Sequence, residues 1–349
     1  MTTPSARVPM VSVIVPCRNE ERYIARCLDS ILASDHPRDA LEVLVVDGRS
    51  DDHTRAVLDA YASRHPIVRV LDNPRRIQAV ALNIGIRAAR GEILVRMDAH
   101  VVYPGNYIGD LVVALQETGA DNVGGALVTL PANETALGKA IAIAMSHPFG
   151  VGNSHFRIGA PEPRWVDTVA FFCCRRETFE RVGVFDEEMA RDEDSEFNAR
   201  LIQRGGRVRL VPSVVCYYYA RGSLGQIARM SYQYGYSKPL VARKLGRVVT
   251  GRQLVPPGFV VTLAATAVLS PWVAAAGLVF AATVAVYLLP VLGFSISVWR
   301  KTGWRTAAAL ALVFPVLHVS YGLGFLTCAL QLALGFGRRA RPVELPLSR

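Results

Sequence analysis

The sequence predicts an α/β domain with a mainly parallel sheet, followed by a C-terminal α-helical transmembrane region. The first part alternates short apolar segments with amphipathic ones, which is the pattern of strands and helices in parallel-sheet proteins. The second part contains two long stretches without Asp, Glu, Lys or Arg, residues 254–298 and 307–335. Each exceeds the roughly 20 apolar residues that cross a bilayer as a helix. We therefore expect a water-exposed domain attached to a membrane region.

Strands and helices are expected in alternation through the first 211 residues. The expected strands are residues 11–15, 42–46, 68–71, 93–97, 122–130, 165–174 and 208–211. The expected helices are residues 22–31, a helix after Asp52, and then 78–89, 107–117, 135–145 and a helix ending near Arg204. The turn after the first strand lacks the Gly-x-Gly-x-x-Gly of dinucleotide-binding proteins, which argues against an NAD enzyme.

Polar residues follow the first two expected strands. The first turn offers Arg18, Asn19 and Glu20, and Asp47 ends the second strand. An acid at the end of a second parallel strand is well placed to bind ribose hydroxyls. For Ser50 to Asp52, capping of the next helix is as good an interpretation as a ligand role.

The segment around which the chain is organised is residues 92–100. A short apolar strand there ends in Asp98-Ala99-His100, so that a carboxylate and an imidazole stand where open α/β sheets bind ligands. Carboxylates suit Mg²⁺ or Mn²⁺, and imidazole suits Mn²⁺ or softer ions. A divalent ion at this place could hold a diphosphate. Taken alone, the triplet would more often be a solvated loop.

Two further segments carry candidate chemistry. Residues 147–155 are glycine-rich and contain two histidines, but they lack the Lys and Ser or Thr of a nucleotide P-loop. We expect a mobile loop that can close over a substrate, with a plain loop histidine as the alternative for either imidazole. Residues 190–197 contain four acids and open a helix. Acids stabilise a helix N-terminus, and a cluster of them in a cleft also raises the pKa of one, as a general base requires.

The chain divides into four expected regions: a domain over residues 1–220, amphipathic or interfacial helices over 221–252, about three transmembrane helices over 253–337 and a basic tail over 338–349. The helix beginning near Gly225 could lie on the membrane surface or pack as an ordinary helix. Ser270-Pro271 splits the first charge-free stretch into a hairpin, and Pro315 interrupts the last span. His318 is costly at membrane depth and is either functional or bonded to a neighbouring helix.

The net charge of +10 comes largely from clusters beside the apolar stretches, which favours anionic lipid headgroups over nucleic acid as the partner. With three spans, the arginines after residue 337 fall on the side of the membrane opposite Arg305, which conflicts with the positive-inside rule. A re-entrant last segment would remove the conflict. No signal peptide is expected at the N-terminus. None of the six cysteines forms a Cys-x-x-Cys pair, so we expect no zinc site and a reducing compartment.

Taken together, these segments resemble the family 2 glycosyltransferases, whose nucleotide-sugar-binding domain has the Rossmann-like GT-A fold. The matching segments appear in the family's order, and they are residues 13–20, 45–52, 78–92, 98–100 and 182–194. The Asp-Ala-His triplet, the 147–155 segment and the C-terminal spans are similar to bacterial succinoglycan-biosynthesis glycosyltransferases of the ExoA type.

The resemblance implies roles for particular positions. Pro16, Glu20 and Asp47 would bind the nucleotide of a UDP-sugar, and Asp98 would lie at its ribose, diphosphate and metal. His100 would bind the ion, Mn²⁺ or Mg²⁺, where the family more often has aspartate. Asp194 would be the general base, with Glu193 beside it. Gln226 to Arg229 matches part of the Gln-x-x-Arg-Trp motif of processive synthases, but the tryptophan is missing, which argues against processivity. The resemblance implies that Arg229 would still contact the diphosphate.

The expected activity is therefore inverting, metal-dependent hexosyl transfer from a UDP-sugar, with UDP-glucose favoured, to a polyprenyl-linked saccharide acceptor. It would serve exopolysaccharide or cell-envelope glycan synthesis at the bacterial inner membrane, with the catalytic domain in the cytoplasm. Two alternatives stay open: a processive polysaccharide synthase and a catalytically silent nucleotide-sugar-binding membrane protein. Product length distinguishes the first, and binding without turnover the second.

Overall fold

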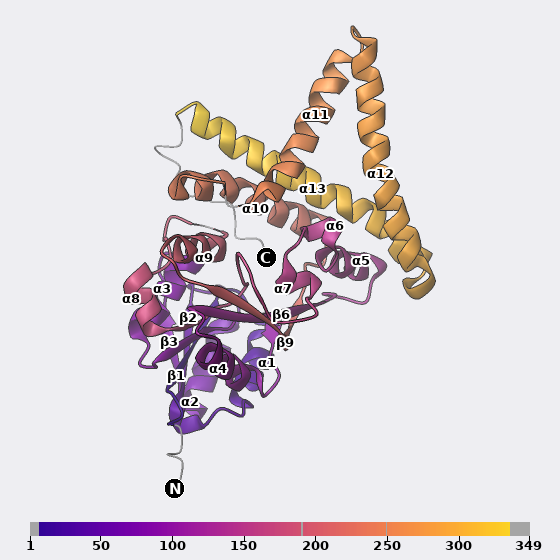
Figure 1. Ribbon diagram of the computed structural model, residues 1–349. Coiled ribbons are helices and arrows are strands. Elements are labelled where there is room, and N and C mark those ends of the chain that lie inside the picture. The colour runs from indigo at the N-terminus through magenta and orange to yellow at the C-terminus, as the bar shows by residue number, and fades with distance from the viewer. Residues whose placement is uncertain (1–6, 190, 249, 336–349) are drawn as a thin grey trace. The chain divides into compact units, whose positions relative to one another are not determined.

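The computed structural model describes residues 7–189, 191–248 and 250–335 (Figure 1). The chain forms two compact units. The first comprises residues 1–128 and 159–218, and the second comprises residues 129–158 and 219–349. Because residues 129–158 belong with the C-terminal part, the two units are not separated by one cut in the sequence. The expected basic tail over 338–349 lies outside the described residues.

The parallel half of the sheet matches the sequence prediction. It contains β1 (Val11–Cys17), β2 (Leu41–Asp47), β3 (Val68–Asp72) and β4 (Ile93–Arg96), in the order β3-β2-β1-β4. Cys17 pairs with Asp47, and Asp47 with Asp72, so the carboxyl ends of these strands share one edge. All residues of β1 and β2 are buried, as expected for strands covered on both faces.

The other half of the sheet is antiparallel and corrects two expectations. It continues through β8 (Cys173–Arg175), β6 (Asn122–Leu130), β9 (Val208–Tyr219) and β5 (Val101–Val102), and β7 (Arg164–Trp165) pairs with β9. The single strand predicted over 165–174 is wrong, because Phe171 and Phe172 turn into the core between two short strands. The strand predicted over 208–211 runs on through Pro212 to Tyr219.

Six helices and a short 3-10 helix surround this sheet within the first unit. They are α1 (Ile24–Leu32), η1 (Arg38–Ala40), α2 (Thr54–Arg64), α3 (Gln78–Ala88), α4 (Tyr107–Thr118), α8 (Arg176–Val182) and α9 (Glu193–Gln203). Helix α3 approaches β1 closely at Gly85, where a Cβ atom would stand 2.4 Å from the side chain of Ile14. The α/β domain predicted from the sequence is thus confirmed.

The second unit is helical. It contains α5 (Ala136–Met145), α6 (Pro148–Val151), α7 (His155–Ile158), α10 (Leu224–Leu245), η2 (Gly251–Leu254), α11 (Val255–Leu269), α12 (Ala274–Thr302) and α13 (Trp304–Ala333). The loop predicted over 147–155 is partly wrong, because the short helix α6 forms within it and α7 begins at its last residue. The Nδ1 of His147 caps α6 by accepting from the amide of Phe149 at 3.1 Å. The interruption predicted at Pro315 is also wrong, because α13 is continuous there.

Helix α10 packs against α13, and both helices can be followed in Figure 1. Glycines form the contact between them. A Cβ atom on Gly324 would stand 2.1 Å from the carbonyl oxygen of Tyr232, and one on Gly235 would stand 1.9 Å from that of Tyr321. The hydroxyl of Tyr236 also donates to Gln331 at 2.6 Å. Of the two interpretations of the segment after Gly225, these contacts support the packed helix.

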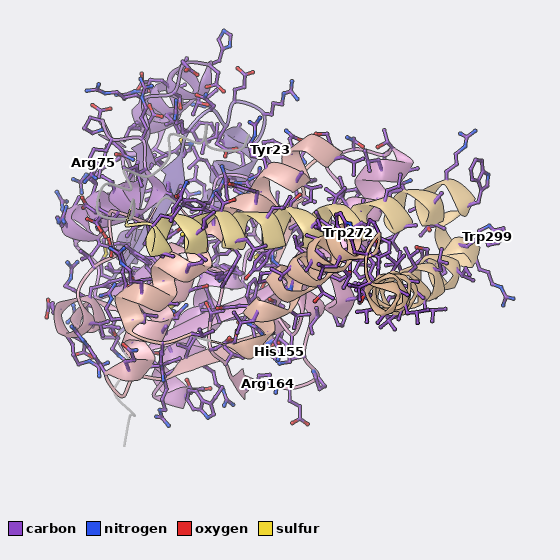
Figure 2. The ribbon with its side chains drawn as sticks, turned by 90° about the horizontal axis from the view of Figure 1, so that it is seen from above. Tyr23, Arg75, His155, Arg164, Trp272 and Trp299 are labelled. Carbon is purple, nitrogen blue, oxygen red and sulfur yellow. The ribbon has the colours of Figure 1, made fainter. Side chains whose placement is uncertain are left out.

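Within the described residues, three helical segments are long and apolar enough to cross a membrane: residues 251–269, 274–302 and 304–333. The membrane region predicted from the sequence is confirmed to this extent. Trp272, two residues before α12, and Trp299, in its last turns, are both exposed and are labelled in Figure 2. At 1.5 Å per residue they are about 40 Å apart along the axis, which matches a bilayer with its headgroup regions. Tryptophan favours both of those interfaces.

His318 is fully bonded within the second unit. Its Nε2 lies 2.8 Å from the carbonyl oxygen of Phe149, and its Nδ1 lies 2.9 Å from the hydroxyl of Tyr287. Its ring also contacts the rings of Phe149 and Phe314. The imidazole therefore links α6 and α12 to α13. Of the two roles expected for His318, this supports the bond to a neighbouring helix.

We predict that Gly324→Ala destabilises the second unit by about 1–3 kcal/mol, because the added methyl group meets the backbone of Tyr232 and cannot be accommodated by a rotamer change. The matched control is Gly293→Ala on α12, where no atom lies within 4 Å of the new Cβ. It should be neutral or stabilising, by about 0.5–1 kcal/mol. Thermal unfolding of both variants in detergent, followed by tryptophan fluorescence, checks this; equal midpoints would contradict it.

Candidate active site

Two turns meet at the carboxyl edge of the parallel strands. The carboxylate of Asp47 accepts hydrogen bonds from the hydroxyl of Ser50 at 2.6 Å and from its amide at 3.2 Å. The Ser50 hydroxyl oxygen accepts from the amide of Asn19 at 2.9 Å, and the Asn19 side chain donates to Asp51 at 2.6 Å. The turn after β1 and the turn after β2 are thereby joined into one rigid rim.

The same turns open the next helix. The amide of Thr54, the first residue of α2, donates to Asp52 at 2.9 Å, and the Thr54 hydroxyl accepts from the amide of Glu20 at 2.7 Å. Capping is therefore a demonstrated role of Asp52. Asp47 has a side chain only 3 % exposed and lies 3.9 Å from the guanidinium of Arg55. Its predicted contact with ribose or uracil stays a prediction.

Backbone strain is concentrated at this edge. Among the described residues, the non-glycine residues with left-handed φ are Asn19, Arg49, Arg76 and Asp192. Three of them follow β1, β2 and β3, and Asp192 directly precedes α9. Such conformations cost of order 1–3 kcal/mol each and cluster at functional sites.

The centre of the site is Arg96, the last residue of β4, which is buried. Its Nε donates to Asp98 Oδ1 at 2.7 Å and its Nη2 to Asp98 Oδ2 at 3.1 Å. Its Nη1 donates to Asp194 Oδ1 at 2.6 Å and to Glu193 Oε1 at 3.1 Å. The guanidinium of Arg96 thus holds together Asp98, which was predicted to lie at the diphosphate, and the predicted catalytic acids Glu193 and Asp194.

The charges in this cluster do not balance, because three carboxylates share one cation. The pKa of Asp194 is raised well above that of an ordinary aspartate by burial, and the nearby charges of Glu193 and Asp98 raise it further against the opposing effect of Arg96. Burial opposes the charge on Arg96, but Asp194, Asp98 and Glu193 outweigh it and raise its pKa well above the usual value. Arg96 stays protonated while Asp194 becomes a better proton acceptor.

Long-range contacts fix the start of α9, which carries the two acids. The Asn83 side chain accepts from the amide of Phe185 at 2.9 Å and donates to its carbonyl oxygen at 2.9 Å. Arg200 donates to the carbonyl oxygens of Val182 and Val184 at 2.6 and 2.8 Å. The segment before α9 is therefore held between α3 and α9, and Asp194 retains a side chain that is 25 % exposed.

His100 lies beside Glu20. Glu20 Oε1 is 3.5 Å from His100 Nδ1, and the imidazole packs edge-on against Tyr218. A carboxylate facing one ring nitrogen is a common partner of a metal-binding histidine. The predicted place of Glu20 in the nucleotide pocket stays a prediction, and the structure adds its ion-pair contact with His100.

Asp98 and His100 fit a divalent ion only if a bound substrate supplies further oxygen ligands. In the described part of the chain, no group of three His, Cys, Asp or Glu side chains is arranged to hold a metal. Mg²⁺ and Mn²⁺ in phosphate-handling proteins take one or two protein ligands, and substrate phosphates and water supply the rest. Asp98 and the oriented His100 suit this arrangement, and the carboxylate of Asp98 retains lone pairs beyond its two bonds to Arg96.

Two other predicted residues lie on β1 and on α10. Pro16 is a buried residue of β1 and pairs with Val46 of β2. Arg229 is an exposed residue of α10 and belongs to the second compact unit. The structure thus brings together Asp98, Glu193 and Asp194.

Sequence reasoning missed Arg96. It was treated only as a strand residue, although a charged side chain inside an otherwise apolar strand next to Asp98 was a signal that could have been used. A buried charge needs partners, and the acids near residue 194 were the available ones.

Comparison with known proteins identifies the family of this chain. Residues 12–185 match the family model described as Glycosyl transferase family 2. The chain is 30% identical over 318 residues to the "Succinoglycan biosynthesis protein ExoA" of Rhizobium meliloti (strain 1021), which covers 90% of this chain and 93% of that protein. The chain therefore belongs to glycosyl transferase family 2.

Two further likenesses are more distant. A dolichyl N-acetyl-α-D-glucosaminyl phosphate diacetamido-dideoxy-glucuronosyltransferase of Methanococcus voltae is 28% identical over 242 residues, 67% of this chain and 74% of that protein. The solved structure of the mannosyltransferase PcManGT from Pyrobaculum calidifontis, in complex with GDP-Man and Mn²⁺, has a TM-score of 0.59 and 23% identity, over 92% of this chain and 88% of that one. The latter supports the predicted GT-A-like fold.

We predict that Arg96→Gln destabilises the first unit by about 3–5 kcal/mol, because it leaves three carboxylates crowded together without their counterion. The control is Arg87→Gln, which removes an exposed arginine 3.5 Å from Glu187 and should cost about 0–1 kcal/mol. Urea unfolding followed by circular dichroism measures both. A loss below 1 kcal/mol in Arg96→Gln would contradict the assignment of Arg96 as the centre of the site.

Proposed function

We propose that this protein is an inverting, metal-dependent hexosyltransferase that moves a sugar from a UDP-sugar, with UDP-glucose favoured, to a polyprenyl-linked saccharide. The observation that carries the proposal is the Arg96 cluster, which holds Asp194 beside Asp98 in a family 2 domain. The similarity to the succinoglycan biosynthesis protein over most of both chains supports a role in exopolysaccharide or cell-envelope glycan synthesis.

Asp194 is the general base of the proposed reaction. Its carboxylate takes the proton from an acceptor hydroxyl as the oxygen attacks the anomeric carbon, the bond from that carbon to UDP breaks, and the configuration inverts. Arg96 fixes the Asp194 carboxylate by a 2.6 Å bond, so the base cannot rotate away from the acceptor. Glu193, held by the same guanidinium, raises the basicity of Asp194 through its charge. Holding both substrates in line supplies much of the rate.

Asp98 and His100 would hold Mn²⁺ or Mg²⁺ against the donor diphosphate. When bound, the ion neutralises the negative charge that develops on the departing UDP. The protein's part is to orient the imidazole through Glu20 and to hold Asp98 through Arg96. Asp47 and Pro16 would contribute to the nucleotide pocket, and Arg229 to the diphosphate.

A membrane-borne acceptor follows from the C-terminal helices. Helices α11 and α12 bury few of their residues against protein, which suits helices surrounded by lipid. A polyprenyl-linked acceptor would be delivered in that lipid. Basic residues beside the spans and the free cysteines, buried and without disulfides in the described chain, support a catalytic domain in the cytoplasm and an inner-membrane location.

We predict that Asp194→Asn lowers sugar transfer by about 10²–10⁴-fold, because the amide cannot accept the acceptor's proton. UDP release would be measured in nanodiscs over a panel of UDP-sugars, with and without a polyprenyl diphosphate sugar. Glu180→Gln, an exposed acid on α8, should leave the rate unchanged. Normal transfer by Asp194→Asn would rule out the base assignment, and UDP binding without turnover by wild type would favour the silent binder.

We predict that EDTA abolishes transfer and that Glu20→Gln raises the Mn²⁺ concentration for half-maximal activity about 10- to 100-fold, because it removes the carboxylate that orients His100. The matched control is Glu21→Gln, the neighbouring exposed carboxylate, which pairs with His53 and should leave the metal dependence unchanged. If Glu20→Gln changed only the KM for the UDP-sugar at saturating Mn²⁺, Glu20 would be a nucleotide contact instead.

A further inference from the structure

Two buried asparagine side chains join the sheet to the helix that carries Asp194. Asn198 stands one turn after Asp194 on α9, and Asn122 begins β6. Both asparagines are 1% exposed. The Asn122 side chain donates to Asn198 Oδ1 at 2.7 Å. Because buried amides are costly unless they are bonded, this pair needs further partners at both of its ends.

A backbone group at each outer end fixes the direction of the two amides. Asn122 Oδ1 accepts from the amide of Cys173 on β8 at 3.2 Å. Asn198 Nδ2 donates to the hydroxyl oxygen of Thr168 at 3.0 Å and to the carbonyl oxygen of Val169 at 3.5 Å. A backbone amide can only donate and a carbonyl oxygen can only accept, so neither asparagine can reverse its amide without losing a bond. The pair is therefore a directed link from β8 to α9.

The segment that Asn198 holds continues to the centre of the site. The ring of Phe171 lies against the guanidinium of Arg96, whose Cζ atom is 5.6 Å from the ring centroid. The carbonyl oxygen of Phe172 accepts from the backbone amide of Arg96 at 2.9 Å. Arg96 in turn donates to Asp194 at 2.6 Å. These contacts close a ring, so that α9 is joined to β4 both by the Arg96 side chain and by the segment that Asn198 holds.

The first turn of α9 needs such a link because it carries three acids, whose like charges repel one another. Arg200 holds the helix to the carbonyl oxygens of Val182 and Val184, which precede it in the chain. Asn198 holds it to the sheet, on the face that Asp194 shares, since residues four apart in a helix lie on one face. An uncharged link on that face fixes the turn without adding charge to the cluster.

We infer that Asn198, together with Asn122, positions Asp194 for proton transfer. The inference rests on the proposed function for the role of Asp194 as general base, and it deepens that function by naming a positioning residue. Asn198 touches no substrate in this role and acts through the geometry of α9. A displacement of about 1 Å at a reacting group can lower a rate by about 10²-fold.

The first test is Asn198→Leu in the full-length protein in nanodiscs, because leucine retains the branched shape of the side chain and removes its hydrogen bonds. We expect kcat, counted per UDP-binding site, to fall about 10- to 100-fold, with the KM for the UDP-sugar unchanged. Calorimetric binding of UDP supplies the number of folded sites. If kcat per site were unchanged, whatever the loss of sites or the change in KM, Asn198 would serve stability alone and the inference would be overturned.

A milder pair of variants decides the matter if Asn198→Leu does not fold. Thr168→Val removes only the hydroxyl that accepts from Asn198 and should lower kcat per site about 2- to 10-fold, whereas Thr168→Ser retains the hydroxyl and should restore the rate. The matched control is Thr118→Val on α4, which removes a half-buried hydroxyl bonded to the carbonyl oxygen of Ala114 and should leave kcat unchanged. Equal rates for Thr168→Val and Thr168→Ser would then overturn the inference.

Hydrogen exchange separates failure of this inference from failure of the proposed function. Asn198→Leu should speed amide exchange in the first turn of α9 by about tenfold, without changing exchange in α2. If wild type transfers sugar and Asn198→Leu matches its kcat per site, the inference is wrong and the function stands. If wild type transfers no sugar, faster exchange confined to α9 supports the anchoring role while the transferase proposal is wrong, and unchanged exchange overturns both.

Discussion

The chemistry of this protein depends on one buried guanidinium. Arg96 ends the strand β4 at the point where the sheet changes from parallel to antiparallel pairing, and its donors point to acids that are almost a hundred residues away in sequence. An arginine can do this because its planar donors bind several carboxylates in fixed directions. The unequal charge that results raises the pKa of Asp194, so the same contact that stabilises the site also prepares its base.

Around this cluster, the fold supplies rigidity rather than further charge. The turns after β1 and β2 are bonded to each other through Asn19 and Ser50, and the segment before α9 is held by Asn83 and Arg200. Left-handed residues such as Asn19 and Asp192 are tolerated because these bonds over-determine their backbone. A site that must align a base, a metal and two substrates gains most from such fixed positions.

The second unit uses a different kind of contact. Glycines let α10 and α13 approach until backbone meets backbone, and His318 joins three helices through its two ring nitrogens. Small residues and interhelical hydrogen bonds stabilise helices where lipid removes the hydrophobic driving force. Helices α11 and α12 bury fewer of their residues than α13 does, which suits a hairpin surrounded by the bilayer and its interfaces.

Local pattern was sufficient for much of this. Most strands and helices of residues 11–130, though not η1 or β5, followed from apolar periodicity and turn residues, as did the membrane region and, from motif order, the family. Each of these signals is encoded within a few neighbouring residues. The segments predicted wrongly, at 147–155, 165–174 and 208–211, take their conformation from distant packing, as when Phe172 enters the core against Phe179 and Phe185.

Within the site, the sequence by itself determined that Asp98, His100 and Asp194 were candidates, since their residue types and their places after strands and before a helix can be seen without coordinates. Only the tertiary structure decided that Glu20 faces His100 and that Arg96 joins Asp98 to Asp194. Pairing and burial depend on which side chains meet across the fold, and no local pattern records that.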